Sequence, residues 1–367
     1  MSTSRKLIWI VVLVAILLIL WWLGGGNTQT PPAADIQEPI KVGVLVPLSG
    51  PAAYYGDQAR IGVELAVGRL DSLYPDLDFS IVYEDSLYNP KTAVEVYAKL
   101  REIDGVDAVV TMASHVSLAV QPLAEGDGIL QMAIASTAGA YSTPGDLSFR
   151  TIPVIKRQTD LLVDYVLSQE YSEIGILNVN NDFGIGGRDA FRSSLQDRGL
   201  IEQVVIEENF LTNATDFRTQ LTKIKAADPD TLFVIGTATD YSSLLRQASE
   251  LGLETQFVSV SSTEDPGLIA NAGEYAEGVI YTYYPIDQGV KNQLPDGYAA
   301  EGYEAVNLVA SSFQKCGKDY QCIQNYLTNL DGYDSIFGDL SFDNSGDVDY
   351  PFIMKTVRDG QFVRLEE

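Results

Sequence analysis

Two stretches of the chain follow one plan, in which a short apolar strand leads through a polar loop and an aromatic–glycine pair into an amphipathic helix. They are residues 41–70, KVGVLVPLSGPAAYYGDQARIGVELAVGRL, and residues 173–195, EIGILNVNNDFGIGGRDAFRSSL. Each helix start carries free N–H groups and a partial positive charge. The repeat therefore predicts two similar lobes, with a small polar molecule held in a cleft between such helix ends.

The alternation of strand and helix continues along most of the chain with short connections, which is typical of a parallel sheet covered by helices. We therefore expect an α/β fold of two Rossmann-like lobes. After Pro285 the pattern predicts two helices, in residues 302–312 and 320–330, with no strand between them. The chain is expected to return to the first lobe there. Short strands between residues 340 and 365 are expected to close the second lobe.

The N-terminus carries an unbroken apolar run, LIWIVVLVAILLILWWL in residues 7–23, that follows Arg5 and Lys6. About 17 apolar residues reach the lower limit for a helix that crosses a bilayer, and the basic flank favours the cytoplasmic side. We expect residues 1–25 to be a cytoplasmic tip and a transmembrane signal-anchor helix, and residues 26–39 to be a flexible linker. The alternative is a signal peptide that is cleaved on export, which would leave a secreted or periplasmic protein.

Acidic residues outnumber basic ones, which gives a formal net charge of −26 and a pI near 4.2. The sequence has no basic patch that could neutralise phosphates, so nucleic acid is not an expected partner. The acidity fits the solvated surface of an extracytoplasmic protein. A hydrophobic share of 46% in 367 residues is enough for two packed cores.

The chain lacks the residue groups that most enzymes assemble. His115 is the only histidine, so a histidine-based triad or a site with several histidine ligands cannot form. Residues 184–187, GIGG, begin like a dinucleotide loop, but Asp189 stands where the last glycine belongs. The acidic residues in 343–349 miss the spacing of a calcium loop. We expect a protein that is not an enzyme and that holds no metal or cofactor.

Cys316 and Cys322 are the only cysteines, in the segment KCGKDYQCI. Their separation is too wide for a C-x-x-C redox or zinc pair. In an extracellular setting they are expected to form one local disulfide between a helix end and the next helix, and a pair of free thiols is the alternative. A further signal is the glycosylation sequon at Asn213, which matters only where the source organism modifies such sites.

Four segments carry a resemblance to a known family: PLSGPAAYYGDQARIGVELAV, DPDTLFVIGTATDYSSLLRQASELGLETQF, AEGVIYTYYP and FGDLSFDNSGDVDYPFIMKTVRDGQF. In order and spacing they resemble the branched-chain amino-acid-binding proteins (Leu/Ile/Val-binding), the type I periplasmic substrate-binding family of ABC transporters, over about residues 40–363. The resemblance implies three crossovers between the lobes, near Pro153, Pro285 and Ile336. The lobes would then be residues 40–154 with 286–336, and residues 155–285 with 337–367.

The resemblance also implies a site at the carboxyl ends of strands, where open α/β sheets bind ligands. In that family a serine after the third strand and a threonine after the fourth hold the ligand's carboxylate. Ser114 matches the first, and Ser136 or Thr137 matches the second. Aromatic side chains before the loop glycines line that family's pocket, and Tyr55 and Phe183 stand in their places. The alternatives are that the hydroxyls cap helices and that the rings pack the lobes.

The sequence departs from the family pattern at the acid that binds the ligand's ammonium group. Ser261 stands there, and a serine cannot neutralise a charge. Either Glu264 takes that role through a shifted loop, or the ligand is not an ordinary α-amino acid. Thr237 lies in a turn where the family carries a tyrosine, so the side-chain pocket is altered as well. His115, beside Ser114, either faces the ligand or is a surface or capping residue.

These features predict an extracytoplasmic substrate-binding protein that captures a small ligand and delivers it to the permease subunits of an ABC transporter. The ligand is expected to be an amino acid or a related carboxylate or amide. The protein is expected at the extracytoplasmic face of the cell membrane, held by its N-terminal helix. The alternative is a ligand-binding sensory ectodomain that acts through a partner protein.

Overall fold

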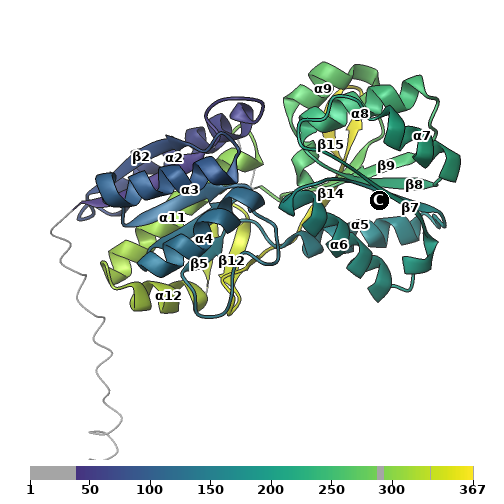
Figure 1. The fold of residues 1–367 in the computed structure, drawn as a ribbon. Helices are drawn as coiled ribbons and strands as arrows, with labels where there is room; N and C mark the ends of the chain where they lie inside the picture. Colours follow the sequence, from purple (N-terminus) through teal and green to yellow (C-terminus); the bar gives the residue numbers. More distant parts are fainter. Residues whose placement is uncertain (1–38, 287–292, 331, 367) are drawn as a thin grey trace, which may run out of the picture. The chain divides into compact units, whose positions relative to one another are not determined.

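The computed structural model describes residues 39–286, 293–330 and 332–366. The predicted membrane anchor, residues 1–25, lies outside these ranges, as does the predicted linker apart from Pro39. None of the helices within these ranges has both the length and the apolar composition that crossing a membrane requires. The strands form three sheets, and helices cover both faces of the two larger ones (Figure 1).

The first sheet has five parallel strands in the order β2-β1-β3-β4-β5. They are β1 (Ile40–Val46), β2 (Phe79–Asp85), β3 (Ala108–Met112), β4 (Leu130–Ile134) and β5 (Ser148–Arg150). The helices of this half are α2 (Ala53–Leu73), α3 (Pro90–Lys99), α4 (Ser114–Asp127), α11 (Gly297–Cys316) and α12 (Tyr320–Thr328), and the short helix η1 (Leu100–Asp104) follows α3. α11, which follows Pro285 in the chain, packs against α2 of this half.

Residues that alternate along a strand pack on opposite faces of this sheet, because successive side chains point to opposite sides. Val44 and Val110 belong to the core that contains α2 and α11, whereas Leu45 and Val109 belong to the core that contains α3 and α4. Burial on both faces explains why these strands appear in the sequence as continuous apolar runs.

The second sheet has seven strands in the order β15-β14-β10-β9-β8-β6-β7. They are β6 (Ile174–Val179), β7 (Val204–Phe210), β8 (Thr231–Ile235), β9 (Gln256–Ser259), β10 (Ile280–Tyr283), β14 (Ile353–Arg358) and β15 (Gln361–Arg364). The strands from β6 to β10 are parallel, and β14 and β15 add antiparallel pairs at one edge. The predicted alternation of the second half is confirmed.

Helices cover both faces of this sheet as well (Figure 1). One face packs against α5 (Ile155–Ser168) and α6 (Asp182–Asp197). The other packs against α7 (Arg218–Ala227), α8 (Ala238–Glu250) and α9 (Pro266–Ala272). Three short 3₁₀ helices lie in the connections, and they are η2 (Ile201–Gln203), η3 (Ser261–Thr263) and η4 (Gly273–Ala276).

Residues 340–342 do not close the second lobe, and that expectation is wrong. They belong to β12 (Gly338–Phe342), which pairs with β11 (Tyr333–Ser335) and β13 (Val348–Asp349) in a small antiparallel sheet. Phe342 packs edge-on against Phe149 of β5, with ring centroids 5.2 Å apart. The chain enters the seven-stranded sheet only at β14, so it stays with the first half well beyond the expected boundary at Ile336.

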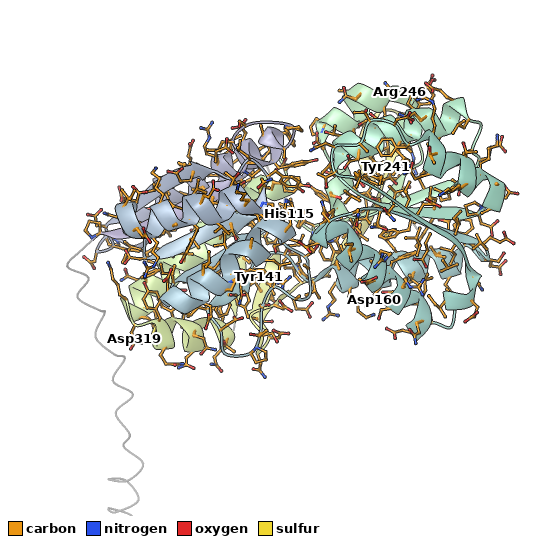
Figure 2. All side chains as sticks on the ribbon, viewed as in Figure 1. His115, Tyr141, Asp160, Tyr241, Arg246 and Asp319 are labelled. Atoms are coloured by element: carbon orange, nitrogen blue, oxygen red, sulfur yellow. A yellow bond between two sulfur atoms is a disulfide. The ribbon has the colours of Figure 1, made fainter. Side chains whose placement is uncertain are left out.

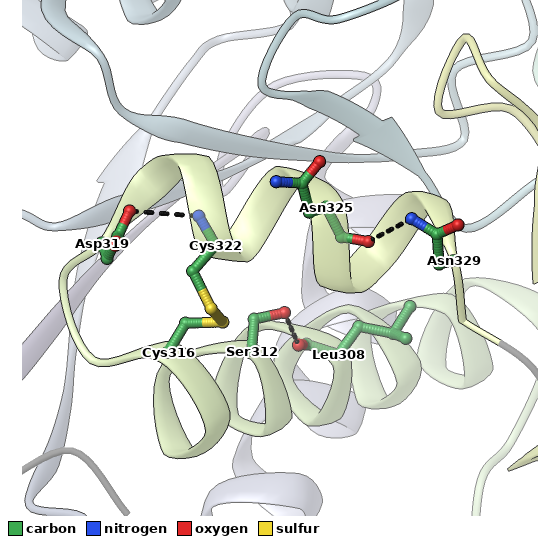
Figure 3. Close-up of a disulfide and its surroundings, with 7 residues drawn as sticks. All are labelled: Leu308, Ser312, Cys316, Asp319, Cys322, Asn325 and Asn329. Atoms are coloured by element: carbon green, nitrogen blue, oxygen red, sulfur yellow. Dashed lines mark hydrogen bonds between the residues drawn. A yellow bond between two sulfur atoms is a disulfide. The ribbon is translucent and has the colours of Figure 1, made fainter. Parts of the chain in front are cut away.

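The predicted disulfide is present between Cys316 and Cys322, whose Cα atoms are 5.5 Å apart (Figure 3). Cys316 is the last residue of α11, and Cys322 lies in the first turn of α12. The Asp319 side chain accepts a hydrogen bond from the Cys322 N–H at 3.1 Å and so caps α12. The disulfide and the cap together fix the tight turn between these two helices.

Candidate ligand-binding site

A cavity lies at the carboxyl ends of strands from both large sheets. It is lined by residues of both halves: Tyr55, Tyr88, Met112, Ala113, Ser114, Ala135, Thr137, Ile152, Phe183, Thr237, Ser261, Ser262, Tyr284 and Tyr298. Among these are six of the nine candidate binding residues from the sequence. Ser136, His115 and Glu264 are not among them.

The repeated aromatic–glycine pair places one ring from each half on this cavity. Gly56 and Gly184 lie in the first turns of α2 and α6, where the helix passes very close to the end of the preceding strand. A Cβ atom at Gly56 would lie 1.8 Å from the Pro47 carbonyl oxygen, and one at Gly184 would lie 1.9 Å from that of Val179. Only glycine allows this approach. The preceding ring, Tyr55 or Phe183, is thereby held at the strand end.

Ser114 presents a hydroxyl donor at the start of α4. It is fully buried, and its Oγ accepts hydrogen bonds from the N–H groups of Thr137 and Ala138 at 3.2 and 3.3 Å. A hydroxyl has two acceptor lone pairs and one donor hydrogen. Both lone pairs are used by these two N–H groups, so the Ser114 O–H can still donate to a ligand. Thr137, from the loop after β4, lines the same part of the cavity. This corner can therefore donate to a carboxylate or carbonyl oxygen.

Ser136 lies behind the wall rather than on it. Its side chain is fully buried, and its carbonyl oxygen accepts a hydrogen bond from the Arg150 guanidinium at 2.9 Å. The same guanidinium donates to the Ala138 carbonyl oxygen at 2.8 Å and pairs with Asp347 at 2.7 Å. Of the two residues left open by the sequence, Thr137 is the one that borders the cavity.

His115, which is labelled in Figure 2, is not among the residues that line the cavity and instead supports one that is. Its Nε2–H donates to the Tyr88 carbonyl oxygen at 3.1 Å, since a carbonyl can only accept, and the two rings meet edge to face at 4.5 Å. Burial lowers the pKa of His115, so the ring is neutral at pH 7. Tyr88 and the residue before it, Leu87, both have positive φ angles, 54° and 50°. The histidine helps to hold this strained loop in place.

The second half contributes Thr237, Ser261 and Ser262. Thr237 is the N-cap of α8 and forms a capping box with Asp240, so its hydroxyl is bonded within the protein. Ser261 borders the cavity at the start of η3, and its N–H donates to the Gln158 side chain at 2.9 Å. The Ser262 hydroxyl donates to the Gly236 carbonyl oxygen at 2.9 Å.

Glu264 lies away from the cavity and is already paired. Its carboxylate forms a salt bridge with Lys355 on β14 and accepts a hydrogen bond from the Tyr281 hydroxyl at 2.6 Å. The structure therefore does not bring this acid to the position where it could neutralise a ligand's ammonium group, as one of the two sequence hypotheses required.

Several lining residues were not found from the sequence. Tyr88 comes from a loop, Tyr284 directly follows β10, and Tyr298 comes from the first turn of α11. Tyr298 meets Tyr55 edge-on, with ring centroids 5.0 Å apart. The position of Tyr284 at a strand's carboxyl end was a usable signal. Tyr298 offered none, because only the tertiary fold brings α11 to this place.

Buried acids stand behind the cavity wall without lining it. Glu301 on α11 accepts hydrogen bonds from the Ala135 N–H at 2.6 Å, the Thr151 hydroxyl at 3.1 Å and the Tyr284 hydroxyl. None of these three donors carries a positive charge, and burial raises the pKa of Glu301 to about 7. Burial also raises the pKa of Asp265 and of Asp296. Across the described ranges, no group of three His, Cys, Asp or Glu residues is placed to hold a metal ion.

A second hollow borders the first and shares four of its residues, Tyr55, Tyr88, Phe183 and Thr237. Its further lining is mostly polar and includes one acid, Asp240, together with Asn181, Thr212, Asn213, Thr215, Thr239 and Ser243. The sequon residue Asn213 therefore lies beside the cavity, where an attached glycan would crowd it.

Comparisons with known proteins agree with this geometry. The model of the periplasmic binding protein family matches residues 39–361. The Leu/Ile/Val/Thr/Ala-binding protein of Pseudomonas aeruginosa is 28% identical over 334 residues, which cover 84% of this chain and 87% of the relative. A leucine-binding protein of Thermotoga maritima superposes with a TM-score of 0.81 at 20% identity, covering 89% of this chain and 98% of the other. A solute-binding protein of R. palustris, solved in complex with benzoate, superposes with a TM-score of 0.80 at 20% identity. The match covers 89% of this chain and 96% of the other.

The family match spans nearly all of the described residues, and it agrees with the two parallel sheets and with the cavity at their strand ends. The chain therefore belongs to the periplasmic binding protein family.

Proposed function

We propose that the protein is the substrate-binding component of an ABC transporter, which captures a small ligand in this cavity and delivers it to the permease subunits. The observation that carries the proposal is the cavity itself, since residues from the strand ends of both sheets line it together. Its curated relatives are named for binding leucine, isoleucine and valine. They are binding proteins and not enzymes, and this chain is a binding protein in the same sense.

The ligand is an amino acid or a related carboxylate or amide. The donor corner at Ser114 and Thr137 supports this proposal, because a hydroxyl donor at a helix start suits a carboxylate or carbonyl oxygen. The aromatic rings of Tyr55, Phe183 and Tyr298 supply an apolar surface for the rest of the molecule. Tyr55 also connects the two halves, because its hydroxyl accepts a hydrogen bond from the Ala238 N–H at 3.2 Å.

We take the lobes to be residues 40–154 with 293–350, and residues 155–285 with 351–366. The membership of the strands in the sheets supports these boundaries. Ligand capture then involves closure about the crossing segments, and the ligand stabilises the closed form by its higher affinity for it.

The protein acts at the extracytoplasmic face of the membrane, and residues 7–23 hold it there. The apolar run and its basic flank support this part of the proposal. Native protein that pellets with membranes and retains residues before Gly24 is the expected result. A soluble native protein whose N-terminus begins near Gly25 would show a cleaved signal peptide instead.

A thermal-shift screen of the purified protein against amino acids, amides and small carboxylates tests the binding function. A ligand at about one hundred times its Kd stabilises the folded state by about 2.7 kcal/mol, which is a clear rise in Tm. We expect at least one compound of these classes to raise Tm. A screen in which none does so would refute the proposed function.

A further inference from the structure

The cavity contains no charged side chain. Among the residues that the structure places on it, none is Asp, Glu, Lys, Arg or His. The lining is aromatic or aliphatic at Tyr55, Tyr88, Met112, Ile152, Phe183, Tyr284 and Tyr298, and the polar remainder consists of neutral serine and threonine side chains. A bound cation would therefore meet only neutral acceptors there.

Five acids close in sequence to lining residues, or bonded to them, have partners within the protein. Glu264 is paired with Lys355, and Asp240 caps α8 through Thr237. Three more acids accept hydrogen bonds within the protein. Asp265 accepts from Gly267 and Tyr55, and Asp296 accepts from Ala299 and Tyr54. Glu301 accepts from Ala135, Thr151 and Tyr284. None of the five lines the cavity. A ligand's ammonium group would therefore meet no carboxylate on the lining of this cavity, and Asp240, which lines the bordering hollow, is already bonded to Thr237.

The free hydrogen-bonding capacity at the α4 end is a donor. The Ser114 oxygen already accepts from Thr137 and Ala138, which leaves its O–H, at the positive end of a helix dipole. This corner favours an anionic oxygen. On the opposite side, Ser261 stands at the start of η3 with a neutral hydroxyl.

From this charge pattern we infer that the ligand is a carboxylate with an apolar body and without an ammonium group, and that Ser261 is a determinant of that specificity. The inference rests on the proposed binding function and narrows its ligand class. An α-amino acid would have to bury its ammonium group without a counter-charge, and such burial is costly. Removing the amine from the ligand removes that cost while leaving the carboxylate and the apolar contacts in place.

Calorimetric titration with matched pairs tests this inference. One pair is 4-methylpentanoate and leucine, and the other is 3-phenylpropanoate and phenylalanine; within each pair only the amine differs. We expect the amine-free acid to bind at least about tenfold more tightly than its amino-acid partner. Equal affinities, or tighter binding of the amino acids, would overturn the inference while leaving the binding function intact. If neither series bound at millimolar concentration, the proposed function would fall together with the inference.

Two variants sharpen the test. Ser261→Asp adds a carboxylate to the cavity wall, and we expect it to reverse the preference, with weaker binding of the amine-free acids and tighter binding of leucine. Glu264→Gln removes the charge but keeps the shape of Glu264, the one acid that the sequence suggested as a partner for an ammonium group. We expect it to leave the ratio of affinities within each pair unchanged. A loss of leucine binding in Glu264→Gln would contradict the inference, and unfolding midpoints of both variants show whether each is folded.

Discussion

At the scale of single residues, Ser114 combines two roles that substitution can separate. Ser114→Ala removes the free O–H and also leaves the N–H groups of Thr137 and Ala138 without their acceptor. We expect ligand affinity to fall by about thirtyfold, for a loss of about 2 kcal/mol. The unpaired N–H groups should also lower the free energy of unfolding by about 1–3 kcal/mol. Calorimetric titration and urea unfolding measure the two effects.

Thr137→Val and Ser168→Ala are the controls for this prediction. Thr137→Val keeps the backbone N–H and the side-chain shape, so it should weaken binding with little change in stability. Ser168 is exposed at the end of α5, where its hydroxyl donates to the Tyr165 carbonyl oxygen and accepts from the Gln169 side chain, both close by in sequence. Ser168→Ala should change neither quantity. If Ser114→Ala lowered stability but left affinity unchanged, the serine would be only a helix-start contact.

The protonation of His115 can be measured without overlap from other imidazole groups, because the chain has one histidine. Burial lowers its pKa below the ordinary value of 6.5, so the unfolded chain binds this proton at a higher pH than the folded chain does. Its contribution to stability is therefore present above pH 6.5 and is lost as the pH falls toward the folded-state pKa. The imidazole resonance in an NMR titration of the folded protein is expected to report a pKa below 6.5.

A variant links this titration to the loop that carries Tyr88. His115→Gln keeps a donor that can reach the Tyr88 carbonyl oxygen but does not titrate. It should remove the part of the loss of stability at low pH that comes from protonation of the histidine, and it should leave ligand affinity near the wild-type value. A histidine pKa at or above 6.5 would contradict the buried, neutral role assigned here.

Sequence reasoning identified the residues that follow strands and missed the residues that tertiary packing brings in. Ser114, Thr137 and Phe183 follow apolar runs, so their place at the carboxyl edge could be predicted from pattern and resemblance. His115 was given two alternatives, and it supports Tyr88 from behind the wall. Tyr298 lies at the start of a helix far along the chain, and no local pattern connects it with Tyr55.

At the scale of secondary-structure elements, the crossing of α2 and α11 depends on small residues. A Cβ atom at Gly62 would lie 1.8 Å from the Ala299 carbonyl oxygen, whereas one at Gly68, two turns along the same helix, would meet nothing within 4 Å. We expect Gly62→Ala to destabilise the protein by about 1–3 kcal/mol or more, because the helices must separate. Gly68→Ala should stabilise it by about 0.5–1 kcal/mol through helix propensity. Denaturant unfolding of the pair measures both, and equal effects would contradict the close crossing.

The helices and strands of the two large sheets could be predicted because their apolar periodicity is strong. The pairing of residues 340–342 with β11 and β13 in a separate small sheet could not be predicted in this way. β13 has two residues, and β12 alternates exposed and buried residues like the edge of any sheet. They contact the first half through the packing of Phe342 on Phe149 and the pairing of Asp347 with the buried Arg150, which lies 197 positions away in sequence. Such a contact leaves no mark on the local pattern.

At the scale of the whole molecule, the buried acids of α11 make stability depend on pH. The pKa of Glu301 is raised to about 7 from an ordinary value of 4.5, so between these values the folded protein holds a proton that the unfolded chain has released. Stability must then fall as the pH rises through this window. Glu301→Gln removes that titration, and its amide can accept from the Ala135 N–H while donating to Tyr284. We expect the loss of stability between pH 5 and pH 8 to be smaller in the variant.

The matched control is Glu95→Gln on the exposed face of α3. Its pH dependence should equal that of the wild type. Burial also raises the pKa of Glu304, one turn along α11, to about 7. Glu301→Gln should therefore reduce the dependence of stability on pH without abolishing it. An unchanged slope in Glu301→Gln would mean that Glu301 is already charged in the folded protein.

The chain leaves the first half after β5, builds five strands of the second, and then returns to place α11 against α2. The hydrogen bond from the Tyr54 hydroxyl to Asp296 joins positions 242 residues apart. During synthesis, therefore, neither half can complete its core until almost the whole protein has been made. We expect a fragment that ends at residue 285 to show no cooperative unfolding transition. The proposed extracytoplasmic location requires export, and we expect this late completion to leave the nascent polypeptide unfolded while it is exported.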